Sequence, residues 1–69
     1  MKYLHTTCNT IGTRNTFFCE YDTGTVYGLE VDIVNENETI VDEDGESMGL
    51  TGEGYQFHAN NIRKCLSEL

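Results

Sequence analysis

The sequence contains no proline and no tryptophan, and only four of its 69 residues are lysine or arginine. Without proline, the chain has no rigid polyproline segment that could serve as a linker or ligand. The basic residues are Lys2, Arg14, Arg63 and Lys64, so the long stretch between Arg14 and Arg63 carries no positive side chain. Because nucleic-acid binding depends on basic groups that neutralise phosphates, we expect no direct nucleic-acid ligand.

Negative charge dominates the same stretch. The net charge is −8, and eleven of the twelve acidic residues lie between Asn15 and Ile62. Such a surface repels anionic membranes and favours a partner protein with a basic surface. No apolar run is long enough to span a bilayer, the first residues lack the apolar core of a secretory signal, and three cysteines suit reduced thiols. These features predict a cytoplasmic protein.

The length predicts one domain covering residues 1–69. A chain of this size buries only about 60% of its unfolded surface, so its stability margin is small. Disulfides, a metal ion or self-association often stabilise such small domains.

Most of the chain has the pattern of short β-strands. In Leu29–Ile33, apolar and acidic residues alternate strictly, which predicts Leu29, Val31 and Ile33 facing the core and Glu30 and Asp32 facing water. Asp44-Gly45 is a strong turn signal. The other predicted strands are Lys2–Thr7, Thr16–Tyr21, Thr39–Val41, Ser47–Leu50 and Tyr55–Phe57.

The end of the chain changes period. Ile62, Cys65, Leu66 and Leu69 follow helical spacing, with Asn60 as a plausible N-cap. Five or six short strands followed by a helix favour a small SH3-like barrel, or a strongly bent antiparallel sheet, with a C-terminal helix. An open antiparallel sheet with the helix across one face is the alternative.

A dense group of acidic residues is the main candidate for a binding surface. Strand residues two apart are about 6.8 Å apart, so a row of carboxylates has a charge spacing similar to that of a nucleic-acid backbone. The group could therefore mimic a nucleic acid and occupy a basic groove, or it could simply be a solvated face that protects sheet edges. Its residues are Glu30, Asp32, Glu36, Glu38, Asp42, Glu43, Asp44 and Glu46.

Aromatic residues supply candidate anchors for the same interaction. Phe17 and Phe18 are consecutive, so they point to opposite faces of their strand, and one of them could be exposed or lie at an oligomer interface. We take Phe18 and Tyr21 as anchors of the binding face, because aromatic residues are enriched at interaction hot spots. A two-sided core is the alternative explanation for both phenylalanines.

Metal-binding and catalytic patterns are weak. An EF-hand loop with Gly45 at its sixth position would begin at Ile40 and end at Thr51, neither of which is a suitable ligand. Cys8 with a nearby histidine is a conceivable nucleophile, but no catalytic signature surrounds it. A zinc site would draw on His5, Cys8, Cys19, His58 and Cys65, without any Cys-x-x-Cys pair. We therefore expect no enzyme activity, no metal and no cofactor.

In overall character the chain resembles the small acidic accessory proteins of phages and other mobile elements, many of which block a host protein. The resemblance implies an inhibitor or regulator but assigns no residue a role. The leading hypothesis is thus a protein-binding module that docks a basic surface of its partner, with a nucleic-acid-binding protein as one candidate partner. The alternatives are an assembly subunit that self-associates through a sheet edge or an aromatic face, and a Cys/His metal-stabilised module.

Overall fold

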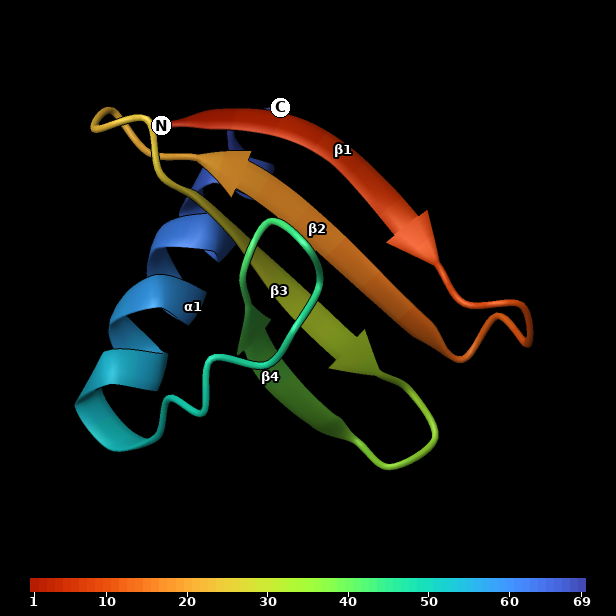
Figure 1. Ribbon diagram of the computed structural model, residues 1–69. Helices are drawn as coiled ribbons and strands as arrows, with labels where there is room; N and C mark the ends of the chain where they lie inside the picture. The colour runs from red at the N-terminus through yellow and green to blue at the C-terminus, as the bar shows by residue number, and fades with distance from the viewer.

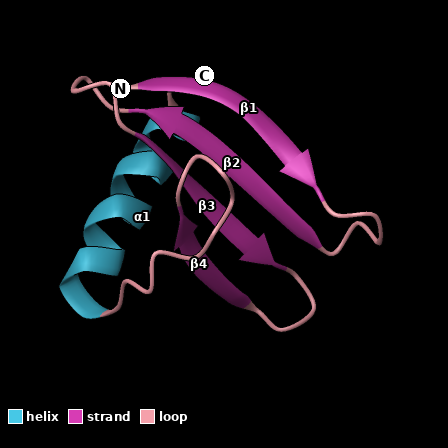
Figure 2. Cartoon of the chain, viewed as in Figure 1, coloured by secondary structure: helices cyan, strands magenta, loops and turns pink.

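The fold is an open four-stranded antiparallel sheet with one helix packed across it. The computed structural model describes residues 1–69 in full. The strands are β1 (Lys2–Cys8), β2 (Arg14–Glu20), β3 (Val26–Asp32) and β4 (Asn37–Val41), and the helix is α1 (Gly52–Ser67). The strands follow one another in the order β1-β2-β3-β4 (Figure 1), and α1 covers one face of the sheet (Figure 2). The prediction of a mainly β domain with a C-terminal helix is confirmed.

The predicted barrel and the count of five or six strands are not confirmed. A barrel would require β1 to pair with β4, but these strands form opposite edges of the sheet. Two of the expected strands are absent: Ser47–Leu50 contributes only an isolated bridge between Val41 and Ser47, and Tyr55–Phe57 lies within α1. With four strands, the apolar face is covered by the helix instead of by closure of the sheet on itself.

Helix α1 begins eight residues before the expected N-cap, Asn60, at Gly52. The stripe that faces the sheet starts with Tyr55 and continues through the fully buried Ala59 and Ile62. Glu53 in the first turn and Lys64 in the last turn both complement the helix dipole. The helix is long enough to cross the sheet, but it depends on tertiary packing for stability, as short helices do. No helix of the structure is both long and apolar enough to cross a lipid bilayer.

The apolar core lies between the sheet and α1. Cys19 of β2, Leu29 of β3 and Ile40 of β4 are buried there together with Ala59 and Ile62. The predicted inward position of Leu29 is therefore confirmed. Alternation along the strands places the intervening residues on the other side of the sheet, which we call the outer face.

The expectations for the end of β3 are wrong. Ile33 lies beyond the end of the strand and is 59% exposed, whereas Asp32 is only 5% exposed. Asp32 is not solvated because its carboxylate folds into the β3–β4 turn, where Oδ1 accepts hydrogen bonds from the backbone N–H groups of Val34 and Asn35, both at 3.1 Å. A carboxylate that closes a turn in this way is buried by the loop that it stabilises.

The two consecutive phenylalanines are divided between the faces. Phe17 packs against the core beneath α1 and is half-buried. Phe18 lies on the outer face and is only 5% exposed. The exposed position considered for one of them is therefore not observed, and the two-sided core is the arrangement found.

Candidate functional site

A groove of about 430 Å³ lies on the outer face of the sheet, away from α1. Strands β1, β2 and β3 contribute residues to it, and the turn at residues 42–46, which follows β4, contributes its far wall. Figure 1 shows the chain after β4 looping in front of the sheet, on the side opposite the helix. The groove is lined by His5, Thr7, Cys8, Asn9, Arg14, Thr16, Phe18, Glu30, Glu43, Asp44 and Gly45.

Phe18 and Gly28 form the packed base of this outer face. They are directly opposite each other in the β2–β3 pairing. A Cβ atom at position 28 would lie 3.0 Å from Cδ1 of Phe18 and 2.7 Å from Cγ2 of Val41, so only glycine leaves room for these side chains. His5 stacks on the Phe18 ring, with ring centroids 4.9 Å apart and planes inclined by 23°. The base of the groove is therefore flat, aromatic and closely packed.

The turn after β4 is held in shape by Asp42. Its Oδ1 accepts hydrogen bonds from the backbone N–H groups of Asp44 at 2.9 Å and Glu46 at 3.0 Å. Gly45 adopts a positive φ of 84° and donates its N–H to the carbonyl oxygen of Asp42 at 2.9 Å. The predicted turn at Asp44-Gly45 is thus confirmed. Because the Asp42 carboxylate is hydrogen-bonded within the turn, Glu43 and Asp44 are the acidic residues of this turn that line the groove.

The basic residue of the groove, Arg14, already has a partner. Its Nε donates to Oδ2 of Asp32 at 3.2 Å, directly across the β2–β3 pairing. Hydrogen bonds from the backbone and the side chain of Asn35 lower the pKa of Asp32, and Arg14 lowers it further, so the carboxylate stays charged and bound. The carboxylates of Glu30, Glu43 and Asp44 therefore face no unpaired lysine or arginine among the groove residues.

The predicted acidic residues thus lie in several different surroundings. Glu30, Glu43 and Asp44 meet at the groove, and Glu46 is exposed at the end of the same turn. Asp32 and Asp42 serve internal turns, as described above. Glu38 accepts a hydrogen bond from Tyr55 at 2.7 Å and pairs with Arg63.

Glu36 is exposed in the β3–β4 turn, where it adopts a φ of 55°. It lies beside a separate hollow that also contacts Ile33 and Tyr55. A continuous row of carboxylates along one strand face, which the sequence suggested, is therefore not formed.

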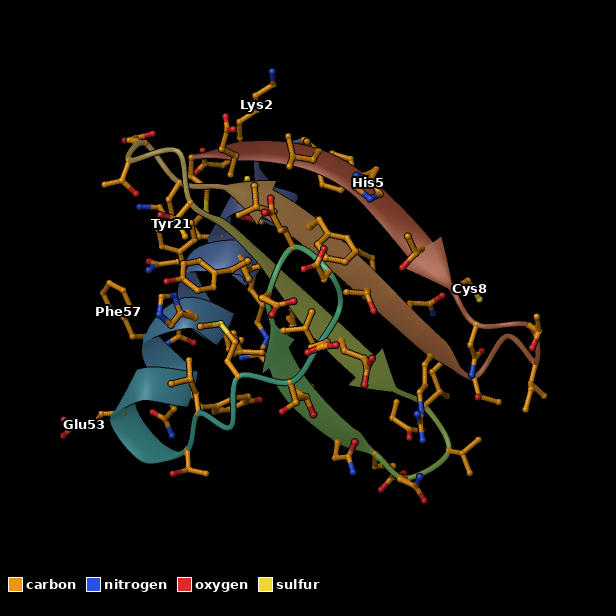
Figure 3. All side chains as sticks on the ribbon, in the orientation of Figure 1. Lys2, His5, Cys8, Tyr21, Glu53 and Phe57 are labelled. Atoms are coloured by element: carbon orange, nitrogen blue, oxygen red, sulfur yellow. The ribbon has the colours of Figure 1, made fainter.

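The two predicted aromatic anchors do not share a surface. Phe18 forms the base of the groove and is covered, so it is not an exposed anchor. Tyr21 lies at the other end of the sheet, where its hydroxyl group and Nδ1 of His58 on α1 form a hydrogen bond of 2.6 Å. Figure 3 shows Tyr21 and Phe57 on the helix side of the molecule, far from Cys8. Tyr21 and Phe57 contribute to a second hollow of about 440 Å³.

Burial changes the chemistry of the Tyr21–His58 pair. It raises the pKa of the Tyr21 hydroxyl and lowers the pKa of His58. Both shifts favour the pair in which the phenol and the imidazole are neutral. The rings of Tyr21, Tyr27 and His58 pack within 5.5 Å of one another. This cluster joins α1 to the sheet.

The cysteines and histidines do not gather into a metal centre. No group of three or more His, Cys, Asp or Glu side chains is arranged to hold a metal ion. Cys19 is fully buried in the core, and burial, together with a hydrogen bond to Cys65, raises the pKa of its thiol to about 12. His5 and Cys8 both border the groove, but residues three apart in a strand point to opposite faces, so they are poorly placed to act as a base–nucleophile pair.

The sequence did not reveal His5, Thr16 or Arg14 as groove residues, nor Gly28 as the residue opposite Phe18. The β2–β3 register places Phe18 opposite Gly28, and the β1–β2 register, which a bulge between Tyr3 and His5 shifts, places His5 opposite Phe18. Comparison with known protein families, with curated proteins and with solved structures finds no match to this chain. The groove is therefore the feature from which a function can be inferred.

Proposed function

We propose that this chain is a protein-binding module, an inhibitor or regulator, whose outer-face groove receives basic side chains of a partner protein. The observation that carries the proposal is the meeting of Glu30 with Glu43 and Asp44 in one groove whose only arginine is already paired with Asp32. Nucleic-acid-binding proteins have basic surfaces of the required kind and are the partner class that we favour. The proposal assigns no catalytic chemistry to the groove.

Arginine suits the groove better than lysine. A planar guanidinium can stack on an aromatic ring while it donates two parallel hydrogen bonds to a carboxylate. The groove offers both elements, since the exposed ring of His5, which stacks on the covered Phe18, lines the groove together with the carboxylates. Lysine would bind the carboxylates as a point charge and would use the aromatic surface less well.

The test compares two triple variants that change the net charge equally. In the groove variant, Glu30→Gln, Glu43→Gln and Asp44→Asn remove three carboxylates from one place. In the control, Glu36→Gln, Glu53→Gln and Glu68→Gln remove three exposed carboxylates elsewhere. Each variant removes three negative charges from the net charge of −8, so the general electrostatic attraction to a basic partner decreases equally in both variants.

The first measurement is a titration of the chain with a short arginine-rich peptide, in which binding is monitored by NMR chemical shifts. We expect the largest shifts at Phe18, Gly28 and Glu30, with affinity that falls as salt rises and is lost only in the groove variant. A lysine-rich peptide of equal charge should bind more weakly. Equal weakening by both triple variants would show that only net charge matters and would refute the proposal.

The second measurement identifies the partner. The wild-type chain, the groove variant and the control are used as baits in cell lysate, and the bound proteins are identified by mass spectrometry. The proposal expects a basic protein that the wild-type chain and the control retain and the groove variant loses. Capture of the same protein by all three baits would place the contact on another surface.

A further inference from the structure

The two edges of the sheet differ. On the β4 side, Val41 bridges to Ser47, and the N–H of Met48 donates to the carbonyl oxygen of Ile40 at 3.0 Å, so the chain after β4 covers the C-terminal end of that edge. On the other side, β1 has β2 as its single neighbour. Figure 1 shows β1 along the free rim of the sheet, and Figure 3 shows His5 and Cys8 on this rim.

The backbone groups that face outward from β1 can be assigned from the pairing. The N–H of Asn9 donates to the carbonyl oxygen of Arg14 at 3.0 Å, and pairing alternates along an antiparallel ladder. Thr7 and His5 therefore direct their backbone groups to β2, whereas Thr6 and Cys8 direct theirs away from the sheet. Strand edges are commonly protected by a charged residue or a bulge. In β1 both devices, Lys2 and the bulge before His5, lie at the N-terminal end, which leaves residues 5–8 unprotected.

The charge distribution indicates which molecule can approach this edge. Residues 1–19 contain no aspartate or glutamate, although the whole chain has a net charge of −8. The β1 strand itself therefore carries no carboxylate, so two β1 strands can meet without acidic side chains of the strand opposing each other. Antiparallel pairing also places the two Lys2 side chains at opposite ends of the contact, so these charges do not oppose each other.

We propose that β1 pairs with β1 of a second copy to form a closed, two-fold symmetric dimer. Antiparallel pairing across a two-fold axis perpendicular to the sheet joins two four-stranded sheets into one sheet of eight strands. Because each copy has one β1 edge and this contact uses both of them, assembly through β1 stops at two. Both helices then lie on one face of the joined sheet and both acidic grooves open on the other. The inference does not depend on the proposed function, and if both hold, one partner surface meets two grooves at once.

The first test uses the wild-type chain without any partner. Sedimentation from about 10 μM to about 1 mM should show a transition from monomer to dimer and no larger species. Over the same range, hydrogen exchange at the Thr6 and Cys8 amides should slow, while exchange at His5 and Thr7 should stay slow throughout. A monomer at every concentration would overturn the proposal, as would a dimer whose Thr6 and Cys8 amides exchange freely, or growth beyond two copies.

A matched pair of variants tests the same contact. Thr6→Pro removes an outward N–H without removing a hydrogen bond to β2, whereas Thr6→Val keeps that N–H. Both variants lose the side-chain hydroxyl contact between Thr6 and Tyr3. Because symmetry removes one hydrogen bond from each copy, we expect Thr6→Pro to weaken dimerisation by on the order of tenfold or more and Thr6→Val to leave it nearly unchanged. Equal dimerisation of the two variants, with both folded by circular dichroism, would place the contact elsewhere.

Discussion

Substitution of Gly28 by alanine tests whether the outer face is packed as closely as the structure shows. A Cβ at this position would lie 2.7 Å from Cγ2 of Val41, 2.9 Å from Cγ2 of Thr16 and 3.0 Å from Cδ1 of Phe18. All three atoms belong to buried side chains, so none can move into solvent without exposing apolar surface. Overpacking of this kind typically costs about 1–3 kcal/mol.

An opposing contribution comes from the unfolded chain. Gly28 is not among the residues with positive φ, so alanine can adopt its backbone conformation without strain. Replacing glycine at such a position restricts the unfolded chain and stabilises the fold by about 0.4–1 kcal/mol. The net expectation for Gly28→Ala is therefore a loss of about 1–2 kcal/mol, which corresponds to a decrease in Tm of roughly 5–15 °C for a domain of this size.

The assay is urea denaturation followed by circular dichroism, with Gly54→Ala as the matched control. A Cβ at Gly54, in the first turns of α1, would meet only Cδ2 of Leu50 at an ordinary 3.7 Å. The same substitution should therefore stabilise the chain there by about 0.5–1 kcal/mol. In Gly28→Ala combined with Val41→Ala, the loss should be smaller than the sum of the two single losses. A neutral or stabilising Gly28→Ala would refute the close packing of Phe18 over this position.

Three further predictions concern titration and thiol access. Burial lowers the pKa of His58, so as the pH falls the unfolded chain protonates this histidine before the folded chain does. The contribution of neutral His58 to the free energy of unfolding should be fully present above about pH 6.5 and should decline as the pH falls through the folded pKa. Urea denaturation across this range should show a flatter pH profile for His58→Phe. Hydrogen bonds in the turn lower the pKa of Asp32, so its contribution to stability is present above about pH 3.9 and is lost as the pH falls through the lower folded pKa. Thermal melts should show that Asp32→Asn has a lower Tm at neutral pH and that its Tm depends less on pH in the acid range. Iodoacetamide should label the exposed Cys8 in the native chain and should label Cys19, whose pKa is raised to about 12, only after unfolding, as peptide mass mapping would show.

Local patterns in the sequence were sufficient to identify all four strands of the sheet. Each has β-branched or aromatic residues, and turn residues separate it from the next. The helix was recognised only from Ile62 onward, because Gly52 and Gly54 resemble a turn and Tyr55–Phe57 resembles a strand when propensity is considered alone. Contacts of Tyr55 and Ala59 with the sheet stabilise the helical conformation of this segment. Tertiary packing therefore determined where α1 begins.

The binding surface could be predicted only in part. Glu30, Glu43 and Asp44 were named as members of an acidic group, but their meeting depends on the fold of the chain over the sheet after β4. The engagement of Asp32 and Glu38 could not be read from the sequence, because their hydrogen-bond partners come from a turn and from α1. The roles of His5 and Gly28 depend on strand register: a bulge in β1 sets His5 opposite Phe18, and the β2–β3 pairing sets Gly28 opposite the same residue.

The two faces of the sheet differ in structure: one packs against α1 to form the core, and the other carries the groove. On the helix face, Leu29 and Ile40 are sealed beneath α1, and that packing supplies most of the buried core. On the outer face, the absence of a side chain at Gly28 leaves room for Phe18 and Val41, and no helix covers the groove. Glu43 and Asp44 lie in a turn that Asp42 fixes internally, so the proposed binding of a basic side chain would require little ordering of the backbone there. The affinity of the groove should therefore depend on its preformed shape as much as on the net charge of the chain.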